Sequence, residues 1–200
     1  MALRKNVCVA ISTFGERLEN ALEVAKNFKA LGVDVMVIHQ LPNAESLCKY
    51  VVNDIQIHEL NSVGVTKSRN YAIDNACNDF LWFMDDDVVV VADQVEKTIS
   101  KLTNSHVGFF VCEVCDEKHQ KRKKYLVEGA AYNRMRVLNI GTIEVIVNLK
   151  EVRKAGVRFP EFMGAGTSLP VSDEAVFLAR LISRNIQGVH VGTTPLIHPA

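Results

Sequence analysis

The sequence has no excess charge of either sign, no long apolar run and few cysteines, and each absence excludes a class of protein. Lysine plus arginine and aspartate plus glutamate both number 23, so no overall charge attracts the chain to nucleic acid. No apolar run is long enough to span a bilayer, and the basic start of the chain leads into a short strand rather than a signal-peptide core. We therefore expect a cytoplasmic protein that binds no nucleic acid.

The five cysteines, an odd number scattered through apolar stretches, are typical of reduced thiols rather than of a disulfide framework. Cys112 and Cys115 form one Cys-x-x-Cys pair with His119 nearby. In the strand expected over residues 107–114, however, side chains three positions apart face opposite sides. A metal or redox site at this pair is therefore not favoured.

Apolar strands alternate with amphipathic helices along the chain. Residues 6–13 and 33–38 are typical of buried parallel strands, and apolar residues at helical spacing fill residues 18–31 between them. The crossover of such a β-α-β unit is right-handed almost without exception, which favours a doubly wound α/β sheet. With 48% apolar residues the 200-residue chain can bury one core, so we expect a single domain over residues 1–200.

The rest of the chain predicts further elements by the same patterns. They are a helix over 44–52, an edge strand over 55–60, a helix opening at Gly64, strands over 80–84 and 107–114, a helix over 94–102, a strand over 140–147, helices over 149–155 and from Ser172, and a last strand from Gly188. Ligands bind at the carboxyl ends of the strands in such sheets. The residues that follow the strands are therefore the candidates for a site.

Three aspartates directly follow the wholly apolar strand at 80–84. Adjacent carboxylates disfavour one another's charged form, so this cluster requires a positive partner. A divalent cation that also binds phosphate oxygens needs only one or two protein carboxylates. On an extended backbone Asp85 and Asp87 face the same side and Asp86 faces the other, so the outer pair can hold one ion. The alternative is that the aspartates cap the next helix or form a turn.

Charged residues also gather at three other places. Lys67 and Arg69 stand in the first turns of a helix, where cations are unusual and where free N–H groups favour an anion such as phosphate. Residues 118–124 form a dense basic segment, which is either a solvated loop or a flap that meets a diphosphate, an anionic acceptor or an anionic membrane surface. Asp173 and Glu174 open the last helix, where they could simply cap it.

Four blocks of sequence carry a resemblance to one family. They are residues 64–73 (GVTKSRNYAI), 80–87 (FLWFMDDD), 159–166 (FPEFMGAG) and 173–178 (DEAVFL). In this order and spacing, over nearly the whole chain, they resemble the inverting nucleotide-sugar glycosyltransferases of family 2, and most of all the small bacterial members that build lipopolysaccharide and capsule.

The resemblance implies a fold and a reaction. The fold is α/β of the GT-A type, which is Rossmann-like with a mostly parallel sheet and helices on both faces. The reaction is that of a hexosyltransferase, which moves a sugar from a nucleoside diphosphate sugar, with a UDP-sugar favoured, to a glycan or lipid-linked acceptor hydroxyl. Residues 1–115 would bind the donor and residues 116–200 the acceptor, and the segment 118–124 would permit contact with the inner face of a membrane.

The resemblance also implies residue roles. Asp85 and Asp87 fall on the Asp-x-Asp pair that holds Mn²⁺ or Mg²⁺, and His198 lies about where some members add a metal-ligand histidine. The nucleotide-sugar would be bound by Thr13, Phe14, Glu16, His39, Lys67, Arg69, Asp85 and Asp86. The catalytic base would be Glu174 or Asp173, and Glu174 is favoured because Phe177 and Leu178 follow it at the family's spacing.

Two features depart from the family. Many members have an aspartate just after the second strand to bind the base or ribose, whereas this chain has Ile38-His39-Gln40. Either His39 or Gln40 takes over that contact, or the nucleotide is held differently. At 200 residues the chain is also short for the family. Whether it has the C-terminal helices that shape an acceptor site or touch a membrane in other members is therefore left open.

The chemistry of sugar transfer requires metal-binding and basic carboxylates, whatever family the chain resembles. The leaving diphosphate is negative, and a metal ion stabilises the charge that develops there. The acceptor hydroxyl loses its proton to a carboxylate on the opposite side of the sugar. A single in-line attack inverts the configuration, so one base suffices.

Three other functions fit parts of the sequence. The Asp85-Asp86-Asp87-Val88-Val89 run matches the haloacid-dehalogenase signature, but in that family it usually lies on the first strand. A nucleotidyltransferase would have a glycine-rich phosphate loop after the first strand, and Phe14-Gly15-Glu16-Arg17 is not one. A non-catalytic GT-A module is disfavoured because both the metal carboxylates and the acidic pair are kept.

Overall fold

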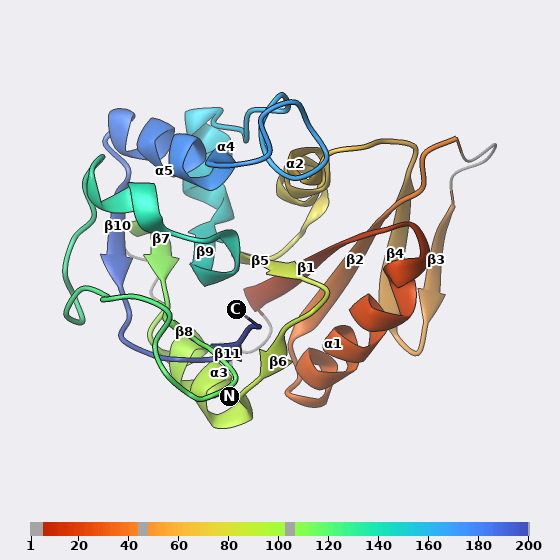
Figure 1. The fold of residues 1–200 in the computed structure, drawn as a ribbon, viewed down its shortest axis with the longest axis horizontal. Coiled ribbons are helices and arrows are strands. Elements are labelled where there is room, and N and C mark those ends of the chain that lie inside the picture. Colours follow the sequence, from red (N-terminus) through yellow and green to blue (C-terminus); the bar gives the residue numbers. More distant parts are fainter. Residues whose placement is uncertain (1–5, 44–47, 103–106, 200) are drawn as a thin grey trace.

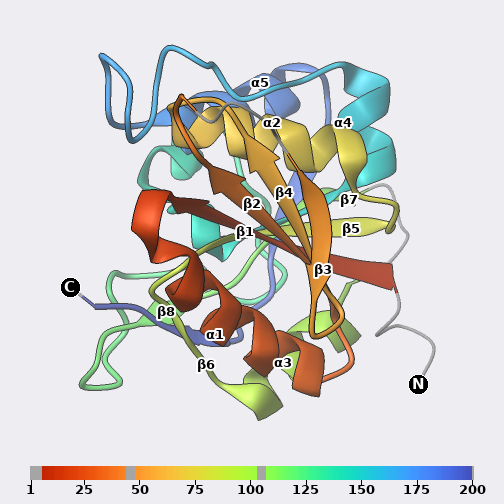
Figure 2. The same ribbon diagram turned by 90° about the vertical axis from the view of Figure 1, so that its right-hand side faces the viewer.

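The computed structural model describes residues 6–43, 48–102 and 107–199, which form three layers (Figure 1). A mixed sheet lies between two layers of helices. The helices α2 (Val65–Asn75), α4 (Leu149–Ala155) and α5 (Asp173–Ser183) cover one face, and α1 (Leu18–Ala30) and α3 (Ala92–Ser100) cover the other (Figure 2). Within the described ranges no helix is long and apolar enough to cross a bilayer.

The main sheet consists of β1 (Val7–Phe14), β2 (Asp34–Gln40), β3 (Lys49–Val52), β4 (Ile55–Leu60), β5 (Phe80–Asp85), β7 (Val107–Val111), β9 (Val145–Asn148) and β10 (Gln187–His190). Its strand order is β10-β7-β9-β5-β1-β2-β4-β3. Neighbouring strands run parallel except where β9 lies between β5 and β7 and where β3 pairs with β4. The predicted α/β architecture with a mostly parallel sheet is thus confirmed.

A second, small sheet joins β6 (Val89–Val90), β11 (Leu196–Ile197) and β8 (Val114–Cys115). In this sheet Leu196 lies opposite both Val90 and Val114. Short 3₁₀ turns occupy Gly15–Arg17, Arg136–Asn139 and Thr142–Glu144. The small sheet therefore places the last described residues beside the segment that follows the aspartate triplet.

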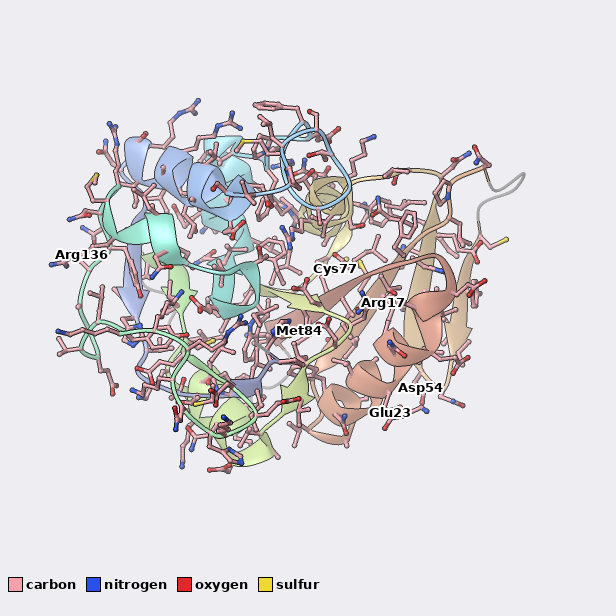
Figure 3. All side chains as sticks on the ribbon, viewed as in Figure 1. Arg17, Glu23, Asp54, Cys77, Met84 and Arg136 are labelled. Atoms are coloured by element: carbon pink, nitrogen blue, oxygen red, sulfur yellow. The ribbon has the colours of Figure 1, made fainter. Side chains whose placement is uncertain are left out.

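Alternation along the strands builds one hydrophobic core on each face of the main sheet. Val9 and Trp82 pack in the core under α1 and α3, whereas Ala10 and Phe83 pack in the core under α2, α4 and α5. The buried Trp82 ring donates a hydrogen bond from Nε1 to the Ile143 carbonyl oxygen, at 2.8 Å. Met84, the last apolar residue of β5, is 1% exposed and lies near the middle of the molecule (Figure 3). Both cores thus hold β5 rigidly up to the residue before the triplet.

The predicted helix over residues 44–52 is wrong where the structure describes it. Residues 49–52 form β3, which pairs with β4, and residues 44–47 lie outside the described ranges. Asn53 and Asp54 between the two strands have φ angles of 50° and 63°. Two consecutive residues with positive φ are typical of the tightest hairpin turns, and Asn and Asp tolerate that conformation better than most residues. The turn chemistry therefore outweighs the weak helical pattern.

Three other predicted boundaries also shift. The expected strand over 140–147 begins only at Val145, because Thr142–Glu144 is a 3₁₀ turn. The backbone N–H of Gly141, just before this turn, donates to the Glu144 side chain. The expected strand over 107–114 ends at Val111, and the helix expected over 94–102 begins two residues earlier, at Ala92. The elements themselves are those that the apolar patterns indicate.

Candidate active site

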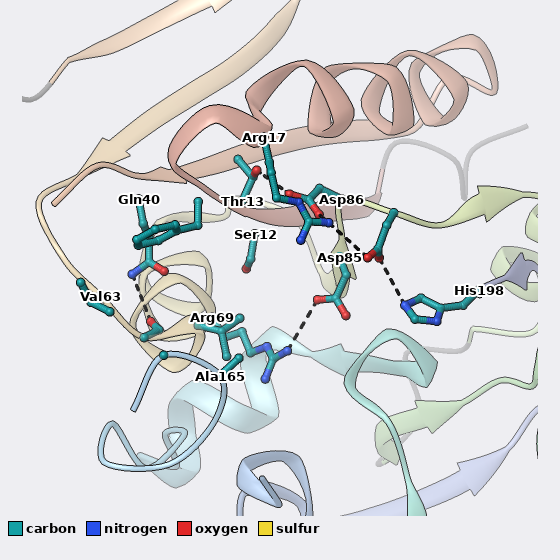
Figure 4. A pocket seen from close by; sticks show the side chains of 15 residues that line it. Ser12, Thr13, Arg17, Gln40, Val63, Arg69, Asp85, Asp86, Ala165 and His198 are labelled. Atoms are coloured by element: carbon teal, nitrogen blue, oxygen red, sulfur yellow. Dashed lines mark hydrogen bonds and ion pairs between the residues drawn. The ribbon is translucent and has the colours of Figure 1, made fainter. Parts of the chain in front are cut away.

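A central cavity of about 430 Å³ opens where the carboxyl ends of β1 and β5 meet (Figure 4). The two strands are parallel, with Ser12 opposite Asp85, so the loops that follow them lie side by side. The lining residues are Ser12, Thr13, Phe14, Arg17, Gln40, Val63, Gly64, Val65, Arg69, Asp85, Asp86, Asp87, Ala165, Gly166 and His198. The cavity thus lies at the edge of the sheet where α/β proteins bind ligands.

The three aspartates of the triplet lie in two different environments. Asp86 is 6% exposed and accepts hydrogen bonds from the Thr13 hydroxyl, at 2.5 Å, and from the Arg17 guanidinium. Burial raises the pKa of Asp86, although these two partners oppose the rise. The side chains of Asp85 and Asp87 remain 38% and 43% exposed. Asp86 therefore ties the triplet to the first-strand loop, while the outer two carboxylates stay open to the cavity.

Arg69 connects the triplet to the last helix. Its Nη1 donates to Asp173 Oδ2 at 2.5 Å, and its Nη2 lies 3.7 Å from Asp85 Oδ1. The guanidinium also lies over the Phe159 ring, with 5.6 Å between the Cζ atom and the ring centroid. Because Arg69 and Asp173 are both buried, this pair fixes the start of α2 against the start of α5.

Glu174 lines a second hollow, the side cavity, with a volume of about 320 Å³. Arg69, Asp85 and His198 line both this hollow and the central cavity, so the two are continuous. Burial, reinforced by the neighbouring negative charge of Asp173, raises the pKa of Glu174 to about 7. A carboxyl group with such a pKa can take up a proton near neutral pH, as a general base must.

His198 reaches the triplet through the small sheet. Its Nε2 lies 3.2 Å from Asp87 Oδ1, and its Nδ1 lies 3.0 Å from the Arg122 guanidinium. No group of three or more His, Cys, Asp or Glu side chains within the described residues is arranged to hold a metal ion. Two open carboxylates nevertheless fit Mg²⁺ or Mn²⁺, because such ions complete their shell with water and phosphate oxygens. Asp85 and Asp87 are therefore the residues that could hold such an ion.

Three of the residues expected to bind a nucleotide-sugar lie outside both cavities. Glu16 and Lys67 are exposed on their helical turns and line neither of them. His39 is 5% exposed, and its Nε2 contacts the Gly15 carbonyl oxygen at 2.7 Å. The turn after β1 places Phe14 and Arg17, rather than Glu16, at the central cavity. Binding of the nucleotide-sugar by Glu16, Lys67 and His39 stays a prediction.

Two further residues line the central cavity: Arg17, to which the sequence patterns assign no role, and Gln40, which they give as the alternative to His39. The Gln40 amide nitrogen donates to Ser62 Oγ at 2.7 Å and to the Gly64 carbonyl oxygen at 3.0 Å, which fixes the orientation of the amide. Arg17 Nη2 contacts Asp86 and lies 3.1 Å from Asp87 Oδ2. The sequence could have indicated Arg17 as a partner of the triplet, because three adjacent carboxylates need a cation and Arg17 follows the neighbouring strand.

The small-residue loop over residues 163–170 closes the cavity between α2 and α5. The Ala165 carbonyl oxygen accepts a hydrogen bond from the Val65 amide at 3.0 Å. Gly164 has a φ of 89°, and a Cβ at this position would lie 2.8 Å from Asp173 Oδ1. Glycine is therefore required here both for the backbone conformation and for the close approach of Asp173.

The comparisons with known proteins agree with this architecture. The structure of S. aureus TarS 1–349 superposes with a TM-score of 0.71 at 12% identity, covering 97% of this chain and 60% of that one. The complex of S. aureus TarS 1–349 with UDP-GlcNAc gives 0.72 at 12% identity, covering 98% and 58%. The chain thus spans about three fifths of the length of these structures, and at this identity the likeness concerns the fold.

The sequence comparisons identify the family. No curated protein matches the chain. The family model described as Glycosyl transferase family 2 matches residues 9–150, well over half of the 200 residues, and this stretch carries β1, the aspartate triplet and Arg69. The chain therefore belongs to glycosyltransferase family 2 and has the GT-A fold.

Proposed function

We propose that the protein transfers a hexosyl residue from a UDP-sugar to a hydroxyl of a glycan or lipid-linked acceptor, with inversion and with Mn²⁺ or Mg²⁺, in the synthesis of a cell-surface polysaccharide. One observation carries the proposal: two open carboxylates, a buried arginine and a carboxyl group with a raised pKa line two continuous cavities. The family membership argues against the phosphohydrolase and the nucleotidyltransferase, and the exposed carboxylates of Asp85 and Asp87 argue against the non-catalytic module.

Asp85 and Asp87 would hold the cation against the donor diphosphate. When bound, the cation stabilises the negative charge that develops on the leaving group. Arg69, 3.7 Å from Asp85, offers a hydrogen-bond donor on the same side, while Asp173 balances its charge. His198, 3.2 Å from Asp87, lies close enough to serve as an additional ligand or to orient that carboxylate.

Glu174 is proposed as the base that takes the proton from the acceptor hydroxyl. Asp173 is the weaker candidate, because it is 3% exposed and its Oδ2 already accepts a hydrogen bond from Arg69 at 2.5 Å. Glu174 lines the side cavity, where a hydroxyl could lie between its carboxylate and the donor. Attack from that side, opposite the diphosphate, inverts the configuration at the anomeric carbon.

The base of the donor is proposed to bind between Phe14 and Gln40. Phe14 is 47% exposed at the rim of the central cavity and offers an aromatic face for stacking. The Gln40 amide is held by Ser62 and Gly64, so it can act as a fixed hydrogen-bonding group where many family members have an aspartate. A uracil base is favoured because the TarS structures of the same fold bind UDP-GlcNAc and UDP.

The donor half over residues 1–115 and the acceptor half over 116–200 remain part of the proposal. The central cavity draws most of its lining from residues 12–87, which supports the donor half. The ion pairs of Lys121 with Glu113 and of Lys123 with Glu144 argue against a membrane contact through residues 118–124.

Donor hydrolysis tests the proposed function. The protein is incubated with UDP-, GDP- and CMP-sugars and Mn²⁺, and release of the free nucleotide is measured with and without a chelator. We expect metal-dependent release of UDP that Asp87→Ala and Glu174→Ala reduce strongly. Glu23→Ala is the matched control, because this α1 carboxylate is 69% exposed and pairs with the exposed Lys26. If Asp87→Ala releases the nucleotide as fast as the wild type does, or if the chelator does not slow the release, the proposal is contradicted.

A further inference from the structure

A third hollow, the outer cavity of about 310 Å³, continues from Glu174 away from the aspartate triplet. It shares Arg122, Gly141 and Glu174 with the side cavity, and Lys123 and Glu144 are among its other lining residues. Glu174 therefore stands where the two hollows join. If the acceptor hydroxyl is at Glu174, the acceptor atoms beyond that hydroxyl extend into the outer cavity.

One of the two cations that line the outer cavity is already neutralised. Lys123 Nζ lies 2.7 Å from Glu144 Oε2 and also donates to the Asn139 carbonyl oxygen. Glu144 is 5% exposed and accepts a further hydrogen bond from the Tyr125 hydroxyl at 2.8 Å. Lys123 therefore balances a buried carboxylate and adds no free charge to the cavity.

Lys121, which precedes Arg122 in the sequence, is also paired with a buried carboxylate. Lys121 Nζ lies 2.5 Å from Oε2 of Glu113, which is 3% exposed and also contacts the buried His190 ring. The two lysines that flank Arg122 thus fasten the basic segment to the protein interior. The middle of this segment is anchored rather than free to lie against a membrane surface.

Arg122 itself differs from its two neighbours. Its contact is with Nδ1 of His198, at 3.0 Å, and it pairs with no carboxylate within the described part of the chain. It lines the side and outer cavities but not the central cavity, where the donor is proposed to bind. A guanidinium has five N–H donors in a planar arrangement that matches phosphate and carboxylate oxygens.

We propose that Arg122 binds an anionic group of the acceptor, a phosphate or a carboxylate carried near the hydroxyl that Glu174 deprotonates. The inference rests on the proposed function, because it takes Glu174 as the base. Arg122 and Glu174 line the same two cavities, so a single acceptor can meet both side chains. The substrate class is therefore an anionic sugar or glycan rather than a neutral one.

Matched acceptors test this inference. The wild type is supplied with a donor that it hydrolyses and with glucose, glucose 6-phosphate or glucuronic acid, and glycosylated products are quantified by mass spectrometry. We expect the anionic acceptors to be preferred. Arg122→Ala is expected to raise their KM about tenfold or more, with a smaller effect on kcat, as loss of one hydrogen bond between charged groups predicts. Arg122→Lys should restore part of the preference.

Binding gives a second readout that does not require turnover. Thermal unfolding of the protein loaded with UDP and Mn²⁺ is followed with glucose or glucose 6-phosphate. The phosphorylated sugar is expected to raise the Tm of the wild type more than glucose does, and this difference should vanish in Arg122→Ala. Lys124→Ala is the control, because this neighbouring lysine lines none of the three cavities.

Different failures have different meanings. If the wild type releases no nucleotide from any donor, the proposed function fails, and this inference fails with it. If the donor is turned over but neutral and anionic ligands behave alike, or Arg122→Ala weakens both equally, only the assignment of Arg122 is overturned. Binding to vesicles of anionic phospholipid that depends on Arg122, without any preference among acceptors, would also overturn it in favour of a membrane contact.

Discussion

Arg69 Nη1 lies 2.5 Å from Asp173 Oδ2, and this buried contact joins two helices whose residues are 104 positions apart in the sequence. The two side chains are only 8% and 5% exposed. Arg69 also lies 3.7 Å from Asp85, so one guanidinium connects the proposed metal carboxylates with the residue beside the proposed base. The geometry of both halves of the site thus depends on this pair.

The first prediction concerns the stability of this pair. Removing one partner of a buried ion pair leaves an uncompensated charge, so we expect Arg69→Ala to cost about 3–5 kcal/mol of unfolding free energy. Urea denaturation monitored by Trp82 fluorescence measures the change. The double variant Arg69→Met with Asp173→Leu should recover part of the loss. A cost below about 1 kcal/mol for Arg69→Ala would show that the contact contributes little.

The second prediction concerns pH. Burial and the charge of Asp173 raise the pKa of Glu174 from 4.5 to about 7. The base acts in its ionised form, so kcat/KM for sugar transfer, which reports the free enzyme, should rise as pH increases through about 7 and then level off. Glu174→Gln should lose activity at every pH. An unchanged rate between pH values well below and well above that pKa would contradict Glu174 as the base.

The same raised pKa makes an opposite prediction for stability. Between pH 4.5 and about 7 the folded protein binds more protons at Glu174 than the unfolded chain does. The contribution of this group to stability is therefore fully present below pH 4.5 and is lost as pH rises through about 7. Urea denaturation of the wild type and Glu174→Gln across this range measures it. The advantage of the variant over the wild type should grow with pH.

The third prediction concerns Gly164. A Cβ there would lie 2.8 Å from Asp173 Oδ1 and 3.0 Å from Thr66 Cγ2, on a backbone with a φ of 89°. Gly164→Ala should displace Asp173 from Arg69, cost about 1–3 kcal/mol by overpacking in addition to the backbone strain, and reduce transfer. Gly32→Ala is the matched control, because Gly32 has a φ of 72° and a Cβ there would meet no atom within 4 Å. Equal effects of the two substitutions would mean that only the backbone strain matters.

The fourth prediction separates Gln40 from His39 as the contact for the donor base. Gln40 lines the central cavity, whereas His39 Nε2 contacts the Gly15 carbonyl oxygen. Loss of one neutral hydrogen bond predicts that Gln40→Ala raises the KM for the UDP-sugar by about two- to tenfold, with kcat less affected. His39→Gln should change KM less. The reverse order of effects, measured from initial rates of UDP release, would assign the contact to His39.

The sequence was most informative where apolar runs are long. The run from Phe80 to Met84 predicts a buried strand, and a doubly wound sheet predicts that the residues after it lie at the ligand-binding edge. The sequence patterns do not show that this strand pairs with β1, and this pairing is what places the aspartate triplet beside Thr13. The hairpin of β3 and β4 was missed because Asn53 and Asp54 decide it locally, against a moderate helical pattern.

The less predictable parts of the site depend on contacts between distant segments. His198 reaches Asp87 only because β11, a strand of two residues, pairs with β6 and β8. Such a short strand has no periodicity that a sequence pattern could reveal. The pairing of Lys121 and Lys123 with buried carboxylates could not be predicted either. A run of basic residues is typical of a solvated loop, and only the fold brings Glu113 and Glu144 next to these lysines.

The antiparallel direction of β9 has one further consequence. Because β7 and β5 run the same way and β9 runs against both, the chain leaves β7 and enters β9 on the same side of the sheet. The segment from residue 112 to residue 144 therefore begins and ends at the edge of the sheet where Glu174 and Asp85 lie. A change in the length or shape of this segment would change which acceptors can reach Glu174. The strands β1 and β5, which carry the proposed donor-binding residues, would keep their register.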